Sequence, residues 1–173
     1  MACALTSDLT PKVCKTPGGV AQILVTEIAN IATLTYTANV VTAFTLATGK
    51  QFRQYTTKAA TSNFKQVGTA ASNAGAYGYA YDLNFQLPNV DTATQEELEL
   101  LMLNTLCVIL KLNDGTYWVV GQEFGLDVTT DTLDSGTALA DFHGNNIQMT
   151  GLGTLRAKLV TPALIPVLIV AAV

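Results

Sequence analysis

The sequence predicts a mainly β domain with one α-helix, and three observations support this fold class. Threonine occurs 25 times and valine is frequent, and both residue types favour the pleated, half-buried surface of a sheet. Apolar and polar residues alternate in short runs that end at Gly, Pro, Asn or Asp. Only one segment has a helical period. The 173 residues suit a single domain, 1–173, with a sizeable core and no internal repeat.

The clearest strand covers 79–87, where every second residue is apolar and the residues between them are polar. Pro88 ends this strand because proline cannot donate a hydrogen bond to a neighbouring strand. Residues 20–28 predict the first strand. Residues 32–49 change phase near Ala38–Asn39, which predicts either two short strands or one strand broken by a bulge.

Residues 90–104 predict the only helix. Thr94 and Glu97 have the spacing of a capping box, and acidic residues in the first turn complement the helix dipole. An apolar stripe at helical spacing then predicts that one face of the helix lies on a sheet. This stripe consists of Leu98, Leu101 and Met102.

Residues 106–123 predict a β-hairpin, because two apolar runs flank a turn at Asp114–Gly115. Tyr117 and Trp118 are adjacent, so they are expected on opposite faces of the second strand. A short strand at 125–130 follows. A last strand or hairpin covers 147–159, which brings the expected total to seven to nine strands.

Three segments fall outside these elements. Residues 1–19 form an irregular N-terminal arm. Residues 49–78 form a long, basic loop between strands, within which 49–68 could instead form a long hairpin. Residues 159–173 carry no charge, but they are shorter than the roughly 20 residues that cross a bilayer, and Pro162 and Pro166 interrupt them. We therefore expect no membrane anchor, and instead an extended apolar arm on its own domain or on a neighbouring subunit.

Charge is scarce and unevenly distributed. Charged residues make up 13% of the chain, against about 25% in a typical globular domain, which favours a protein that covers its surface with copies of itself. Residues 1–81 have a net charge of +4 and residues 82–173 a net charge of −8. The two halves form either ordinary solvated faces or a polar unit whose basic loop meets an acidic face of the next copy. Because the net charge is −4 and no basic cluster is dense, binding of free nucleic acid is not expected.

The three cysteines do not predict a metal site. Cys107 lies in an apolar run and is expected in the core. Cys3 and Cys14 either pair when oxidised or remain free, and two cysteines fall short of the four ligands of a zinc site. The first nine residues lack the pattern of a secretory signal, so we expect reduced thiols in the cytosol.

Residues 132–146 hold His143, the only histidine, and are the segment in which to look for chemistry. Ser135 and Asp141 lie near it, but Ser135 lacks the strand–turn–helix context of a nucleophile. The acidic residues of the region also lack the spacing of a calcium loop. We therefore expect a surface connection built by turn chemistry, with no catalytic residue, no cofactor and no metal.

The hairpin and this segment together resemble a known family. The stretch "VILKLNDGTYWVVGQEFGLDVTTDTLDSGTALADFHGNNIQMTGLG" resembles the tail-tube (major tail) proteins of tailed phages of Bacteroidetes-type hosts, and "CKTPGGV" resembles the start of that family. The resemblance is close only over about 106–153, and the histidine at position 143 departs from it. The matching positions are Cys14, Gly18, Gly19, Asn113, Gly115, Tyr117, Trp118, Gly121, Gly125, Leu126, Ser135, Gly136, Asp141 and Gly144.

The resemblance implies a tail-tube-like domain, which is a β-sandwich or rolled barrel with a flanking helix. It implies stacked rings that self-assemble into a tube for genome passage, with contacts to other tail proteins and no specific binding of the viral DNA. The protein would then lie in the virion tail, and in the host cytoplasm during assembly. The loop 49–78 and the arm 159–173 would make the subunit contacts. The interface candidates are Lys50, Arg53, Lys58, Lys65, Leu164, Ile165, Val167, Leu168 and Ile169.

Other roles remain open at this point. A capsid decoration, head-fibre or tail-completion protein would have a similar composition. A β-sandwich binding module would need an exposed aromatic cluster, and Tyr77, Tyr79 and Tyr81 are the only candidates. The alternation of Tyr79 and Tyr81 with polar residues predicts that these two are buried. An enzyme is not expected.

Overall fold

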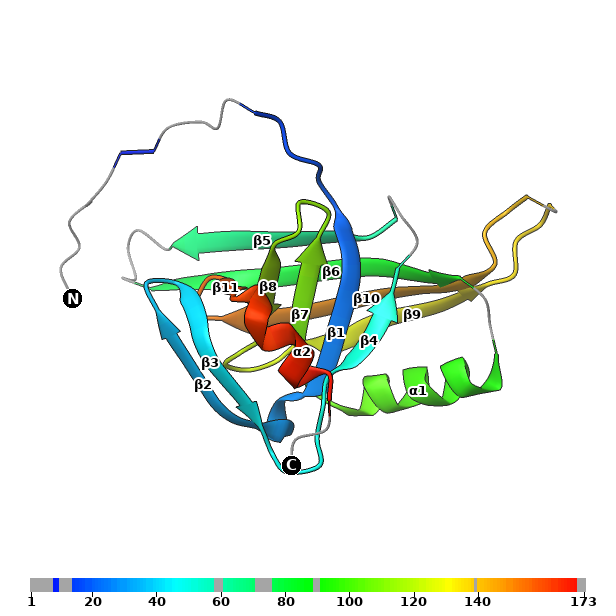
Figure 1. Ribbon diagram of the computed structural model, residues 1–173. Helices are drawn as coiled ribbons and strands as arrows, with labels where there is room; N and C mark the ends of the chain where they lie inside the picture. The colour runs from blue at the N-terminus through cyan, green and yellow to red at the C-terminus, as the bar shows by residue number, and fades with distance from the viewer. Residues whose placement is uncertain are drawn as a thin grey trace.

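The computed structural model describes residues 8–9, 14–57, 61–70, 76–88, 91–138 and 140–170, and within them the chain forms two β-sheets (Figure 1). A seven-stranded sheet, called sheet A, has the order β2 (Ile31–Thr37), β3 (Val40–Leu46), β11 (Lys158–Val160), β8 (Tyr117–Val120), β7 (Leu106–Leu112), β1 (Val20–Glu27) and β4 (Arg53–Thr56). A four-stranded sheet, called sheet B, has the order β5 (Asn63–Ala70), β6 (Tyr77–Pro88), β10 (Gly144–Gly153) and β9 (Asp127–Asp134).

Two α-helices accompany the sheets, α1 (Thr92–Leu103) and α2 (Ile165–Leu168), together with 3-10 turns at Ile28–Asn30 and Pro162–Leu164. The predicted mainly β class with a flanking helix is confirmed, although the described residues contain eleven strands rather than seven to nine. Sheets A and B face each other like the layers of a sandwich, and their strands cross in Figure 1.

The main core lies between the two sheets. Alternate residues of β6 are buried, as the pattern predicted, and they meet apolar side chains of β1 and β7 from sheet A. Tyr81 is buried and Tyr79 half-buried, whereas Tyr77 is exposed. The residues that β6 contributes are Tyr81, Leu83, Phe85 and Leu87.

A second core covers the opposite face of sheet A. The central strands are therefore buried on both sides, which explains their nearly continuous apolar sequences. Tyr117 packs against this second core and Trp118 against the first, so the prediction that they face opposite ways is confirmed. Helix α2 lies over this face and contributes Ile165 and Leu168 (Figure 1).

The predicted apolar arm 159–173 packs on its own domain, which is one of the two alternatives, but its described part is not extended throughout. Residues 158–160 join sheet A as β11, parallel to β3 and antiparallel to β8. The chain then turns into α2, where Ile165 and Leu168, three residues apart, both point into the sheet. Pro162 and Pro166 do not prevent this, because each lies at the start of a helical turn, where no backbone N–H is needed.

The prediction of a long loop at 49–78 is wrong. This segment contains β4 and β5, which are edge strands of sheets A and B. Their pattern was misleading because an edge strand with one solvent-facing side keeps few apolar residues. Tyr55 and Phe64 pack against the core, while most of their neighbours are exposed.

The alternative of two strands within 32–49 is correct. Strands β2 and β3 form a hairpin whose two turn residues, Ala38 and Asn39, both have positive φ angles of 48° and 70°. This geometry is that of a type I′ turn, which matches the twist of paired strands.

Helix α1 is confirmed, but its start differs from the prediction. Asp91 caps the helix, and its side chain accepts a hydrogen bond of 2.7 Å from the Thr94 N–H. The Thr94–Glu97 capping box is therefore wrong, and the first turn contains no acidic residue. Leu98 and Leu101 are buried as expected, whereas Met102 is 55% exposed and does not belong to the packed face.

Gly151 allows a close approach between β10 and the turn that precedes β9. A Cβ atom at position 151 would lie 2.5 Å from the backbone oxygen of Gly125. We expect Gly151→Ala to lower the free energy of unfolding by about 1–3 kcal/mol, because the backbone must shift to remove the overlap. Urea denaturation measures this effect. Gly18→Ala is the matched control, since a Cβ there meets nothing within 4 Å, and an equal loss in both variants would contradict the prediction.

Cys107 is a buried core residue, as predicted. Burial raises the pKa of its thiol to about 12, so the thiolate is suppressed at neutral pH. We expect Cys107 to resist iodoacetamide in the native protein and the exposed Cys14 to react. Mass spectrometry of the alkylated protein, before and after addition of urea, checks the labelling.

The Cys107 thiol also affects stability at high pH. Because its pKa in the folded protein lies above its pKa in the unfolded chain, the stability that the neutral thiol contributes is lost as pH rises from about 9 towards 12.

Candidate subunit-assembly surfaces

Sheet B ends in two strands that have no neighbouring strand on their outer side among the described residues, although helix α1 lies close to β9 (Figure 1). These are β5 and β9, each eight residues long, and six residues of each are exposed. The backbone groups on such an edge are available for pairing with another chain. Sheet B therefore carries two similar edges, one on each side.

The two edges carry opposite charges. Strand β5 has one basic residue, Lys65, and no acidic residue. Strand β9 has three aspartates, Asp127, Asp131 and Asp134, and no basic residue. The structure thus places a part of the basic half and a part of the acidic half on opposite edges of one sheet.

Two polar side chains next to the β9 edge lack hydrogen-bond partners within the described residues. One oxygen of Asp131 is buried without a partner, and burial raises the pKa of this carboxyl group. Both amide atoms of Asn145, on the adjacent strand β10, are also unpaired, and this residue is 1% exposed. Buried polar atoms without partners cost free energy, so this edge is incompletely satisfied in the isolated chain.

The outer face of sheet B is polar but nearly free of charge. Asp82 on β6 accepts hydrogen bonds of 2.9 Å from the amides of Asn84 and Gln148. Lys65, the only basic residue of the four strands, lies opposite Asp82 in the register of β5 and β6. Amide and hydroxyl side chains make up much of the rest of this face, and Val67 and Leu152 are exposed apolar residues on it. The amide and hydroxyl residues are Asn63, Gln86, Thr130, Thr132, Asn146 and Thr150.

The predicted interface residues fall into separate places. Lys50 and Arg53 line a groove of about 480 Å³ between β4 and α1, whose wall also includes Tyr55 and Glu97. The Tyr55 hydroxyl donates a 2.8 Å hydrogen bond to Glu97, and burial together with this bond raises the pKa of Tyr55. Lys65 lies on the β5 edge, away from this groove. Lys58 lies outside the described residues, as do Cys3 and most of the arm 1–19.

The apolar candidates divide between core and surface. Ile165 and Leu168 are buried in their own domain, so they cannot contact a neighbouring subunit in this structure. Leu164 and Ile169 are half-buried against the same core. Val167 is 69% exposed, so it alone of the five predicted residues presents its side chain fully to solvent.

The segment around His143 is a turn, as expected. Asp134 accepts a 2.9 Å hydrogen bond from the Gly136 N–H, and Asp141 accepts bonds from the N–H groups of Thr137 and Ala138. These backbone bonds lower the pKa of Asp141. Within the described part of the chain, no group of three or more His, Cys, Asp or Glu side chains could hold a metal ion.

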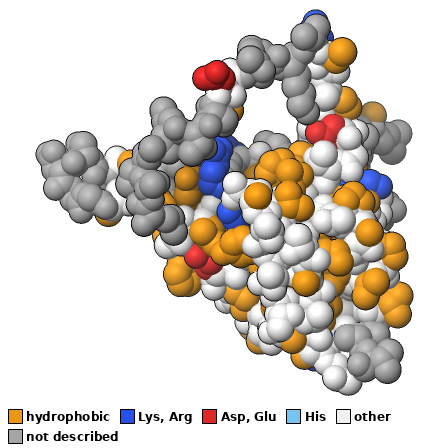
Figure 2. All heavy atoms as spheres, turned by 60° about the vertical axis from the view of Figure 1, so that its left-hand side comes forward, with side chains coloured by type: hydrophobic (Ala, Val, Ile, Leu, Met, Phe, Trp, Pro, Cys, Tyr) orange, Lys and Arg blue, Asp and Glu red, His pale blue; other side chains and the backbone are white. Residues whose placement is uncertain are grey.

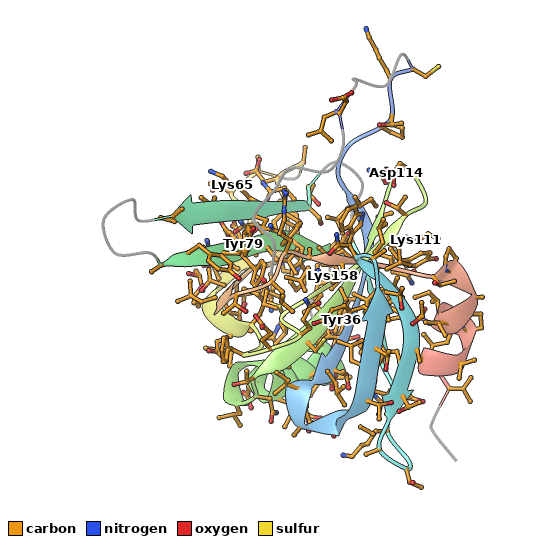
Figure 3. The ribbon with its side chains drawn as sticks, turned by 90° about the vertical axis from the view of Figure 1, so that its left-hand side faces the viewer. Tyr36, Lys65, Tyr79, Lys111, Asp114 and Lys158 are labelled. Atoms are coloured by element: carbon orange, nitrogen blue, oxygen red, sulfur yellow. The ribbon has the colours of Figure 1, made fainter. Side chains whose placement is uncertain are left out.

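A pocket of about 720 Å³ opens at one end of the sandwich, and the sequence did not reveal it. Its lining combines aromatic rings with two cationic side chains, and Figure 3 shows Tyr79 and Lys158 on this end. Figure 2 shows Lys and Arg atoms beside exposed hydrophobic side chains on the side that is turned forward. We call this site the aromatic pocket, and its main residues are Phe64, Tyr77, Tyr79, Trp118, Arg156 and Lys158.

Comparisons with known proteins identify no relative, since no family model, no curated protein and no solved structure matches the chain. None of the described helices has the length and apolar character needed to cross a membrane.

Proposed function

We propose that the protein is a structural virion protein that self-assembles into rings, and that stacked rings form a phage tail tube for genome passage. The observation that carries this proposal is the pair of oppositely charged edges of sheet B, neither of which pairs with another strand among the described residues. When one surface of a subunit binds a different surface of the next, repetition generates a ring or a filament. The β5 edge of one copy and the β9 edge of the next supply such a pair of surfaces.

Strand direction favours this pairing. All three pairs within sheet B are antiparallel, so β5 and β9 run in opposite directions. Placing β5 of one copy beside β9 of the next therefore continues the antiparallel alternation without a break. A closed ring of such sheets is a barrel without edges, which also removes the hazard of exposed edge strands. Charge attraction between Lys65 and the β9 aspartates would favour this orientation over edges of the same kind.

The unpaired polar atoms at the β9 edge support the same contact. A neighbouring strand beside β9 would bring backbone and side-chain groups close to Asp131, whose buried oxygen lacks a partner among the described residues. Satisfying buried polar atoms is favourable because it removes the cost of leaving them without hydrogen bonds.

In such a ring, the outer face of sheet B would line the lumen. Non-specific DNA binding depends on contacts between Lys or Arg and phosphates. This face has one lysine, and it lies opposite Asp82. A surface dominated by amides and hydroxyls would stay hydrated and let DNA pass without holding it.

Negative-stain electron microscopy of the purified full chain tests the proposal. We expect hollow tubes or stacked rings of uniform diameter, and sedimentation velocity should show large species that grow with concentration. A protein that remains monomeric, or forms only small closed oligomers, would refute the tube. Small closed oligomers would favour a decoration, head-fibre or tail-completion role instead.

A further inference from the structure

The aromatic pocket is built to receive an apolar group that carries negative charge. Lys158 is 7% exposed, and its ammonium group donates to the Asn39 side chain and lies 5.1 Å from the centroid of the Tyr36 ring. Arg156 is exposed, and its guanidinium carbon lies 6.0 Å from the centroid of the Tyr79 ring. Within the described residues, Arg156 forms no ion pair with a carboxylate.

The backbone around Arg156 is fixed in place. The Glu123 carboxylate accepts hydrogen bonds of 2.6 and 3.1 Å from the N–H groups of Thr154 and Leu155. Burial alone would raise the pKa of Glu123, but these hydrogen bonds outweigh it and lower the pKa. Glu123 is therefore ionised at neutral pH and holds the turn that presents Arg156 at the pocket.

The chain carries a matching group elsewhere. The end of the β9–β10 hairpin, here called the hairpin tip (residues 132–138 and 140–143), extends beyond the other elements in Figure 1. Leu133 in the tip is 56% exposed, Asp134 follows it in the sequence, and Asp141 also lies in the tip. No lysine or arginine occurs between Lys111 and Arg156, so the tip is uniformly acidic.

The tip and the pocket lie at opposite ends of sheet B. Strand β10 starts at Gly144, next to the tip, and ends at Gly153, which pairs with the pocket residue Tyr79. Ten extended residues span roughly 33 Å, so the two sites cannot meet within one chain. Translation of a copy along the strands of sheet B brings its tip to the pocket of the next copy.

We propose that the hairpin tip of one copy docks in the aromatic pocket of the next copy and that this head-to-tail contact stacks one ring on another. Leu133 enters among the rings of Tyr77, Tyr79 and Trp118, and a tip aspartate pairs with Arg156. This inference rests on the proposed tube, because lateral pairing through the edges of sheet B would set the strands along the tube axis. The hairpin tip would then make a subunit contact that the sequence analysis had assigned to the loop 49–78.

Disulfide trapping between two proteins that each carry one introduced cysteine tests the contact. One protein carries Leu133→Cys and the other Tyr77→Cys, each with Cys3→Ser and Cys14→Ser, while Cys107 stays because it is buried. Positions 77 and 133 in one chain lie roughly 33 Å apart along β6, and a disulfide needs Cα atoms within about 7 Å. A bond between the two therefore forms only between copies, and non-reducing gels of the mixture report it.

We expect the mixture to cross-link about tenfold faster than a control mixture of Tyr77→Cys with Leu103→Cys, as a contact worth roughly 1.4 kcal/mol would give. Leu103 is 80% exposed on α1, away from the tip. Arg156→Glu in the Tyr77→Cys protein should remove this advantage. Equal rates for the two mixtures, or a rate unaffected by Arg156→Glu, would overturn the inference.

The result is separable from that of the proposed function. Tubes in the micrographs without preferential trapping would support the tube and reject the contact between the hairpin tip and the aromatic pocket. Trapping without rings or tubes would keep the head-to-tail contact and reject the ring. Circular dichroism of each variant confirms that the cysteine proteins are folded before they are mixed.

Discussion

A proline in the β9 edge is expected to abolish tube formation while leaving the domain folded. Thr132 and Leu133 are adjacent in β9, opposite Asn146 and Asn145 of β10. Because N–H groups alternate in direction along a strand, one of these two residues directs its N–H to β10 and the other directs it outward. We therefore expect one proline variant to lose stability and the other to remain folded but unable to pair with a neighbouring strand.

The loss is expected to be complete because every contact in a ring repeats the defect. Each missing hydrogen bond leaves a backbone acceptor of the neighbouring copy unsatisfied, at a cost of about 1–3 kcal/mol per interface. The proline side chain also clashes with the approaching strand. Electron microscopy and sedimentation velocity report assembly, and circular dichroism reports folding. Thr132→Val is the matched control, since it keeps the N–H and the branched side chain. Tubes formed by a folded proline variant would rule out pairing through this edge.

The second large effect is expected at Leu168. This side chain is 2% exposed and belongs to the core beneath sheet A, and the Leu168 carbonyl accepts a 2.8 Å hydrogen bond from the Phe52 N–H. Leu168→Ala should lower the free energy of unfolding by about 2–5 kcal/mol, through lost apolar burial and the cavity that remains. This is a large fraction of the roughly 5–15 kcal/mol that stabilises a typical domain.

Val167 provides the control for this prediction. It is adjacent in α2 but 69% exposed, so Val167→Ala should change stability by no more than about 0.5 kcal/mol. Urea denaturation followed by tryptophan fluorescence measures both variants, because Trp118 is the only tryptophan. If Leu168→Ala left stability unchanged and reduced only assembly, α2 would belong to a subunit interface rather than to the core.

The sequence predicted those elements whose local pattern matches their surroundings. Strand β6 has one side in the core and one in water, so its period of two was clear. The β7–β8 hairpin was equally clear, since Asp114–Gly115 separates two apolar runs. The segment around His143 was correctly expected to be a turn because Asp and Gly residues satisfy its backbone locally.

Features that depend on distant contacts were not predictable. Strand β5 looked like a loop because it is an edge strand with few apolar residues. The two prolines made the short helix α2 hard to predict. This helix is favourable because it covers the second face of sheet A, which would otherwise be exposed. The aromatic pocket joins residues far apart in the sequence, as shown by the hydrogen bond between the Gln66 side chain and the Ala157 N–H, 91 residues away.

The position of β11 has a consequence for the order of folding. This strand of three residues joins β3 to β8, and no other described strand connects the β2–β3 hairpin to the rest of sheet A. The hairpin can form early because its contacts are local, but its docking must wait for residues 158–160, which come more than 100 positions later in the chain. During synthesis, the apolar surfaces of the β2–β3 hairpin and of the rest of sheet A stay uncovered until residues 158–160 emerge. Folding of sheet A is therefore expected to be completed only after most of the chain has been translated, and until then its uncovered apolar surface is prone to aggregation.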